Sequence, residues 1–104
     1  MLEKLDAIDY SSERLELYRI VEDNFVELLL KHVAPWGGYA TRAVSLWLDN
    51  GKIEYALVRV NYNGTGKDLL AERVLMPSET EKLYKQLMSI KTIDEFYNFV
   101  ETYF

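Results

Sequence analysis

The sequence predicts an α+β domain in which a three-stranded antiparallel meander packs against a long N-terminal helix and two C-terminal helices, in the order α-β-β-β-α-α. Three observations support this class. Apolar residues fill one half of a helical wheel over residues 12–33, an Asn-Gly turn separates two β-rich runs, and two helix-capping motifs precede apolar stripes near the C-terminal end. The 104 residues, 49% of them apolar, predict one domain spanning 1–104 with a real core.

The first predicted element is a helix from about Ser12 to Val33. Ser11 or Ser12 suits the N-cap position. At 100° per residue the apolar side chains cover a wide half-cylinder and the charged side chains cover the rest. Pro35 and the glycines after it are expected to end the helix.

The clearest local signal is Asn50-Gly51, which stands between β-rich runs at 39–48 and 53–62. Asn-Gly in a two-residue loop is typical of a type I′ hairpin, so we expect Asp49 opposite Lys52. The expected register is regular along both strands and separates a core face, with Leu and Ile pairs, from a mixed second face.

Turn-forming and helix-capping residues also delimit the remaining predicted elements. Residues 63–68 predict a second turn, and Leu69–Met76 predicts the third strand, which Pro77 ends. Ser78–Glu81 and Thr92–Glu95 match the capping box, so each is expected to open a C-terminal helix with an apolar stripe.

The second face of the predicted meander is partly apolar, and it is our predicted interaction surface. Its aromatic and β-branched residues are typical of protein contacts. We expect a homodimer through this face or through the outer strand. In the competing arrangement the C-terminal helix covers the face and the protein is a monomer. The candidate interaction residues are Trp36, Tyr39, Trp47, Val58, Val60 and Tyr62.

Three arginines form the alternative candidate site. The regular register sets Arg42 opposite Arg59, and Arg73 on the third strand is a third member. Like charges directly opposed are unfavourable unless something neutralises them, so the set predicts an anion or nucleic-acid site on the sheet. Two alternatives remain open: an internal acid such as Glu22 pairs with the arginines, or a bulge near residues 57–58 separates them.

Composition excludes several chemistries. The chain has no cysteine and one histidine, so neither a thiolate zinc site nor a histidine metal site is expected, and no cofactor is predicted. A net charge of −5 disfavours nucleic acid and anionic membranes as partners. Gly64-Thr65-Gly66-Lys67 lacks the spacing of a phosphate-binding loop and predicts a hairpin loop. The charged N-terminal residues and the absent cysteine favour a cytoplasmic protein without a membrane span.

These observations predict a non-catalytic protein-interaction module that acts by stoichiometric contact with a protein partner. Adaptors, inhibitors and immunity-type proteins, including those of viruses and other mobile elements, belong to this class. An enzyme that uses His32 with a carboxylate is a third hypothesis, but the sequence places no nucleophile or acid beside His32, and a structural histidine is favoured. A single glutamine among many glutamates and lysines points weakly to a thermophilic source.

Overall fold

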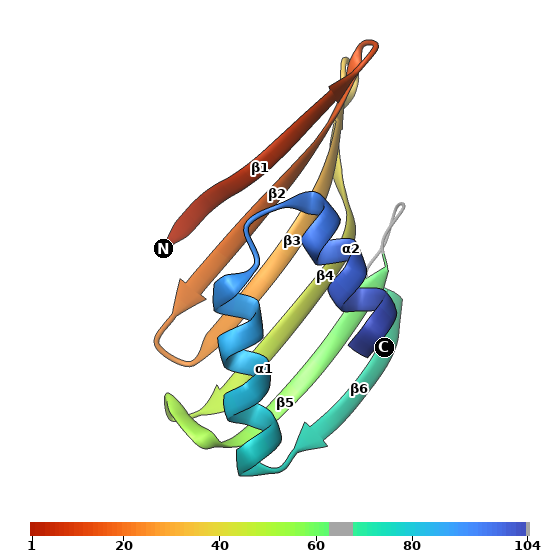
Figure 1. Cartoon of the computed structure of the whole chain (residues 1–104). Coiled ribbons are helices and arrows are strands. Elements are labelled where there is room, and N and C mark those ends of the chain that lie inside the picture. The colour runs from red at the N-terminus through yellow and green to blue at the C-terminus, as the bar shows by residue number, and fades with distance from the viewer. Residues whose placement is uncertain (63–67, 104) are drawn as a thin grey trace.

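Six antiparallel strands, followed by two helices, make up the chain (Figure 1). The computed structural model describes residues 1–62 and 68–103, and only the backbone at residues 39–40, 54–55, 57, 59–62 and 68. The strands pair in chain order as one meander. The elements are β1 (Leu2–Tyr10), β2 (Glu13–Glu22), β3 (Phe25–Ala34), β4 (Gly37–Asp49), β5 (Lys52–Tyr62), β6 (Asp68–Leu75), α1 (Pro77–Ser89) and α2 (Ile93–Tyr103).

The predicted N-terminal helix is wrong, because residues 12–33 belong to two strands and the turn between them. β2 and β3 are a hairpin in which Glu22 pairs with Phe25 across the turn. Burial alternates strictly along β3, with every second residue from Val26 to Ala34 buried. Both faces of these strands carry apolar residues, so the same residues also fill a wide arc of a helical wheel. The fold is therefore a six-stranded sheet with two C-terminal helices, not a three-stranded meander behind a long helix.

The first strand was not predicted at all. β1 lies at the sheet edge and pairs only with β2, with a register shift at Leu5. Leu5 packs against the core, whereas Leu2, Ile8 and Tyr10 are exposed. A strand with one core contact and alternating charges has too weak a hydrophobic pattern to be recognised from sequence.

Both helices lie on one face of the curled sheet, which we call the helix side; the opposite face is the outer side (Figure 1). The core lies between the sheet and the helices. From the sheet it contains Leu17, Val26, Leu28, Leu30, Val44, Leu46, Leu48, Ala56, Val58 and Leu75, and from the helices Leu83, Leu87, Ile93, Phe96 and Val100.

The Asn50-Gly51 hairpin is confirmed, with Asp49 paired to Lys52 and positive φ angles of 47° and 76° at the two turn residues. The predicted register beyond the turn is wrong. After Asp49–Lys52 the next pair is Leu48 with Ala56, so residues 53–55 of β5 have no partner in β4. Because three is an odd number, the insertion moves the following β5 residues to the opposite face.

This shift determines the core. Val58 pairs with Leu46 and is fully buried on the helix side, although the regular register assigned it to the second face. It also separates the two arginines, since Arg42 pairs with Tyr62 and Arg59 pairs with Ser45. The alternative of a bulge near residues 57–58 is therefore right about the separation of the arginines, but the irregularity lies closer to the turn, at residues 53–55.

The junction between α1 and α2 is attached to the first two strands by Arg19. Its Nη1 donates to the carbonyl oxygens of Leu87, Met88 and Ile90 at 3.3, 3.0 and 2.9 Å. Its Nη2 lies 2.9 Å from Glu3 Oε1. Arg19 is only 9% exposed, so these bonds satisfy both a buried cation and the last carbonyls of α1.

The start of α2 is held by two caps. The backbone N–H of Ile93 donates to Asp6 Oδ2 of β1 at 2.8 Å. The predicted capping box at Thr92–Glu95 is confirmed, because the Glu95 N–H donates to Thr92 Oγ1 at 3.1 Å. The predicted box at Ser78–Glu81 is wrong: α1 begins at Pro77, and it is Glu79 that accepts from the Met76 N–H.

Val58→Asp should unfold the protein. The substitution buries an unpaired carboxylate in the core and should cost more than about 4 kcal/mol, a large part of a domain's stability. Thermal melts followed by circular dichroism test this. Val74→Asp is the matched control, since Val74 is 75% exposed on the same sheet. Equal melting temperatures for the two variants would contradict the assigned register.

Arg19→Met should lower the free energy of unfolding by about 2–4 kcal/mol, because it leaves the carbonyls at the end of α1 unpaired. Arg19→Lys should lose less, since an ammonium group can still reach part of this set. Urea denaturation measures both. Lys85→Met, at an exposed ion pair with Glu81, should cost less than about 1 kcal/mol, and a comparable loss there would refute the special role of Arg19.

Candidate interaction surface

The outer side of the sheet carries an apolar row that crosses four strands. Phe25 of β3 pairs with Trp47 of β4, which pairs with residue 57 of β5, and that residue pairs with Val74 of β6. The Phe25 and Trp47 rings stack, with centroids 4.8 Å apart and planes 16° apart. Trp47 is 40% and Val74 75% exposed. We call Phe25, Trp47 and Val74 the outer row.

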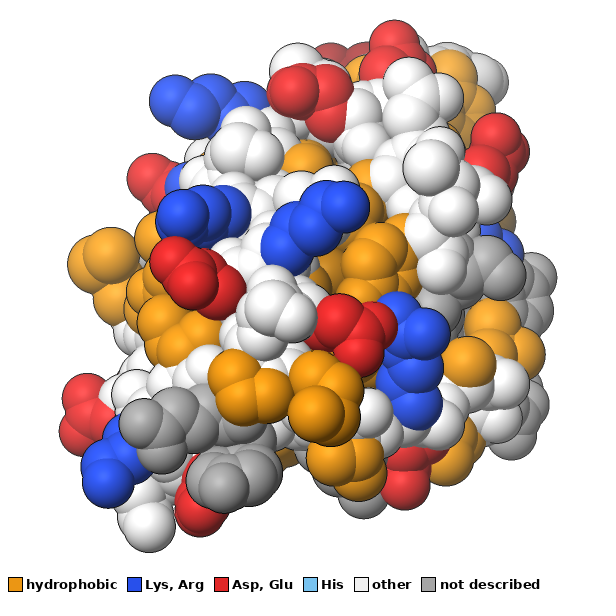
Figure 2. Space-filling view, turned by 60° about the horizontal axis from the view of Figure 1, so that its bottom comes forward, with side chains coloured by type: hydrophobic (Ala, Val, Ile, Leu, Met, Phe, Trp, Pro, Cys, Tyr) orange, Lys and Arg blue, Asp and Glu red, His pale blue; other side chains and the backbone are white. Residues whose placement is uncertain are grey.

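Acidic residues flank the outer row. Glu22 pairs directly with Phe25, and its carboxylate lies 3.2 Å from the Met1 ammonium. The adjacent cross-strand row consists of Glu27, Ser45, Arg59 and Glu72. Ser45 Oγ donates to Glu27 Oε1 at 2.7 Å, which fixes that carboxylate beside the row. Figure 2 views the end of the molecule with the β4–β5 turn and the start of α1; hydrophobic side chains lie there in several groups among acidic and basic ones.

An ion-pair cluster occupies the outer side over β1 and β2. Tyr18 donates its hydroxyl to Glu16 Oε1 at 2.6 Å, and Lys4 Nζ and Arg14 Nε lie 3.0 and 3.3 Å from Glu16 Oε2. The hydrogen bond from Tyr18 and then the Lys4 ammonium hold the pKa of Glu16 below its usual value. The same bond raises the pKa of Tyr18. These satisfied charges stabilise the β1–β2 strand pair.

The predicted interaction residues do not form one surface. Val58 is fully buried on the helix side, and Trp47 lies on the outer side. Trp36 is 73% exposed in the β3–β4 turn, at the other end of β4 from Trp47. Ten residues of β4 lie between the two tryptophans, which puts them about 35 Å apart along the strand. The side chains of Tyr39, Val60 and Tyr62 lie outside the described part of the structure. Sequence reasoning had missed Phe25 and Val74, which only the register brings beside Trp47.

The three arginines are not brought together as a clamp. Arg73 lies on the helix side, where its Nη2 is 2.9 Å from the Tyr103 hydroxyl and 3.5 Å from Glu79 Oε2. Arg42 pairs with Tyr62, at a different level of the sheet from the Arg73–Val58 pair. The side chain of Arg59 is outside the described residues, but its backbone pairs with Glu72 rather than Arg42.

His32 has a carboxylate beside it after all. Its Nε2 lies 3.1 Å from Glu13 Oε2, and the Tyr10 ring packs 6.2 Å from the imidazole. Glu13 and His32 are 19 positions apart in the sequence and become neighbours through the β2–β3 hairpin. His32 is buried, with 9% exposed, and the Glu13 side chain is 31% exposed.

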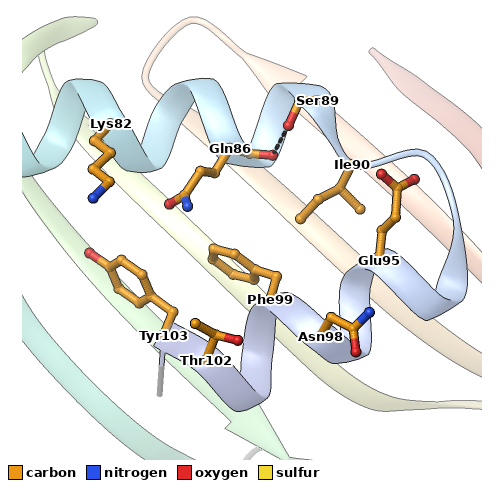
Figure 3. A pocket seen from close by; sticks show the side chains of 9 residues that line it. All are labelled: Lys82, Gln86, Ser89, Ile90, Glu95, Asn98, Phe99, Thr102 and Tyr103. Carbon is orange, nitrogen blue, oxygen red and sulfur yellow. Dashed lines mark hydrogen bonds between the residues drawn. The ribbon is translucent and has the colours of Figure 1, made fainter.

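A groove of about 500 Å³ lies between the two helices (Figure 3). Ile90, Phe99 and Tyr103 form its apolar part, and polar side chains from both helices surround them. The Gln86 amide oxygen is buried there and accepts no hydrogen bond within residues 1–62 and 68–103. The groove is shallow and open, and its polar rim contrasts with the aromatic outer row.

Within the described ranges no group of acidic, histidine or cysteine side chains is arranged to hold a metal ion. None of the described helices has the length and apolar character that crossing a membrane requires. The chain matches no protein-family model, no curated protein and no solved structure. Its function is therefore inferred from its own geometry.

Glu16→Gln should flatten the pH dependence of stability in acid. Because the folded pKa of Glu16 is lowered, its contribution is complete above the unfolded value of 4.5 and is lost as pH falls through the folded pKa. Urea denaturation between about pH 3 and pH 6 should show a smaller acid loss for the variant. Glu101→Gln, on an exposed part of α2, is the control with the same charge change. Parallel curves for wild type and Glu16→Gln would contradict this assignment.

Proposed function

We propose that the protein is a non-catalytic interaction module that acts by stoichiometric contact with a protein partner through the outer row. The observation that supports this is the row itself: Phe25 and Trp47 stack on the face that neither helix covers, and Val74 lies in the same cross-strand register, on the far side of β5. Stacked aromatic side chains on an uncovered sheet are typical of contact centres. Inhibitors, adaptors and immunity-type proteins work in this way, and the cysteine-free chain suits the cytoplasm.

The charges around the outer row indicate which kind of partner surface is electrostatically complementary to it. Three carboxylates, Glu22, Glu27 and Glu72, flank the apolar centre against the Arg59 position and the Met1 ammonium, and the whole chain carries a net charge of −5. The complementary surface is an apolar patch bordered by lysine and arginine. Such charges accelerate association and disfavour acidic proteins and nucleic acid as partners.

Trp47→Ser should weaken a complex with the partner at least about 30-fold, because truncating an aromatic anchor costs about 2 kcal/mol or more. The partner is first isolated with immobilised wild-type protein, and the purified complex is then titrated by calorimetry. Trp36→Ser is the matched control, since it removes an exposed tryptophan far from the outer row.

Hydrogen exchange on the purified complex locates the contact. Protection of the β3 and β4 amides around Phe25 and Trp47 is expected. An equal loss of affinity for both tryptophan variants, protection confined to the helices, or a partner that is chemically altered by the protein would each overturn the proposal.

A further inference from the structure

Three carboxylates flank the outer row, and two of them have a positive charge opposite them. The Glu22 carboxylate lies 3.2 Å from the Met1 ammonium. Glu72 pairs across β5–β6 with the Arg59 position, so the register sets residues of opposite charge against each other there. The third carboxylate, Glu27, is different, because among the described side chains the one bond that it accepts comes from a neutral hydroxyl group.

That hydroxyl group fixes the Glu27 carboxylate close to Trp47. Glu27 and Ser45 are a cross-strand pair of β3 and β4, and Ser45 Oγ donates to Glu27 Oε1 at 2.7 Å. Ser45 is only 3% exposed, so the carboxylate that it binds is held against the sheet over β4. Trp47 follows two residues later on the same face of β4, about 7 Å along the strand. A negative charge and an exposed indole ring are therefore separated by about the size of one side-chain head group.

We propose that Glu27 and Trp47 together bind an arginine side chain of the partner. This inference rests on the proposed function, because it names the partner residue that contacts the centre of the outer row. A guanidinium group placed between the two side chains can donate to the carboxylate and still lie within the about 6 Å that a cation–π contact allows. Among aromatic rings, the indole of tryptophan attracts a cation most strongly.

Arginine fits this site better than lysine does. Its planar guanidinium can donate two parallel N–H bonds to one carboxylate, and the Ser45 hydroxyl occupies only one of the about four lone-pair sites of Glu27. The same planar group packs against aromatic rings and is less strongly hydrated than an ammonium group. The apolar stem of arginine can also cover the stacked rings of Phe25 and Trp47, whose centroids are 4.8 Å apart.

The open face limits the affinity of the site in isolation. Trp47 is 40% exposed, and Glu27 is partly exposed, so water reaches both groups. Exposed ion pairs and exposed cation–π contacts are each weak. We therefore expect a dissociation constant of about 1–10 mM for a short peptide that contains one arginine. A whole partner surface excludes water around the site and strengthens both contacts.

Three blocked tripeptides test the assignment: acetyl-Leu-Arg-Leu-amide and the same peptide with lysine or citrulline at its centre. Citrulline has nearly the shape of arginine but no charge. Trp36→Phe leaves Trp47 as the one tryptophan of the chain, so fluorescence then reports on this site. We expect the arginine peptide to bind at least about ten times more tightly than the citrulline peptide and about three times more tightly than the lysine peptide.

Variants in the same Trp36→Phe background identify the carboxylate. Glu27→Gln should weaken the arginine peptide at least about fivefold and leave the citrulline peptide unchanged. Glu101→Gln is the matched control, since it removes the same charge from an exposed part of α2, on the other side of the sheet. Ser45→Ala keeps the charge but releases the carboxylate, so it should reduce the preference for arginine over lysine. Thermal melts establish that each variant is folded.

Two results would overturn the arginine site: equal affinities for the arginine and citrulline peptides, or equal effects of Glu27→Gln and Glu101→Gln. The contact with a partner protein can fail separately. If the peptides do not discriminate but Trp47→Ser still weakens the purified complex, the outer row binds through apolar contacts alone and the arginine site is wrong. If the arginine peptide binds selectively but Trp47→Ser leaves the complex unchanged, the arginine site stands and the proposed function fails.

Discussion

The arrangement of the two layers depends on one buried cation. Arg19 projects from β2 into the junction between the helices and binds three carbonyl groups at the end of α1, while Glu3 of β1 balances its charge. Asp6, three residues further along β1, caps the first turn of α2. The end of one helix and the start of the next are thus attached to adjacent strands. A shift of either helix along the sheet breaks bonds to buried polar groups, each of which is costly to leave unpaired.

Fixing both helices on the same face has a consequence for the other face. A curled six-stranded sheet has two surfaces, and the helices can bury only the helix side. On the outer side, the ion pairs of Glu16 cover β1 and β2. Phe25, Trp47 and Val74 remain partly or largely exposed on the same side. The uncovered apolar surface is therefore a product of the layer arrangement. It is also the basis of the proposed function.

The sequence predicts features that depend on neighbouring residues correctly, but it does not predict contacts between residues far apart in the chain. The Asn50-Gly51 turn and the Thr92 cap depend on neighbouring residues, and both are confirmed. The residues assigned to an N-terminal helix form a hairpin. Because β2 and β3 are apolar on both faces, their two-residue period also fits the apolar arc of a helical wheel. No local pattern relates Arg19 to carbonyl groups 68 or more positions away. The same limit applies to the outer row, whose members come from three strands.

The unpaired residues 53–55 link the core to the candidate site. With a regular register, Val44 would pair with Leu57 on the helix side, and Val58 would share a face with Trp47. The three-residue insertion transfers Val58 and Ala56 to the helix side, where they pair with Leu46 and Leu48 in the core. Trp47 stays outside, next to Phe25. One local irregularity thus determines both which β5 residues enter the core and which β5 position lies opposite Trp47 on the outer side.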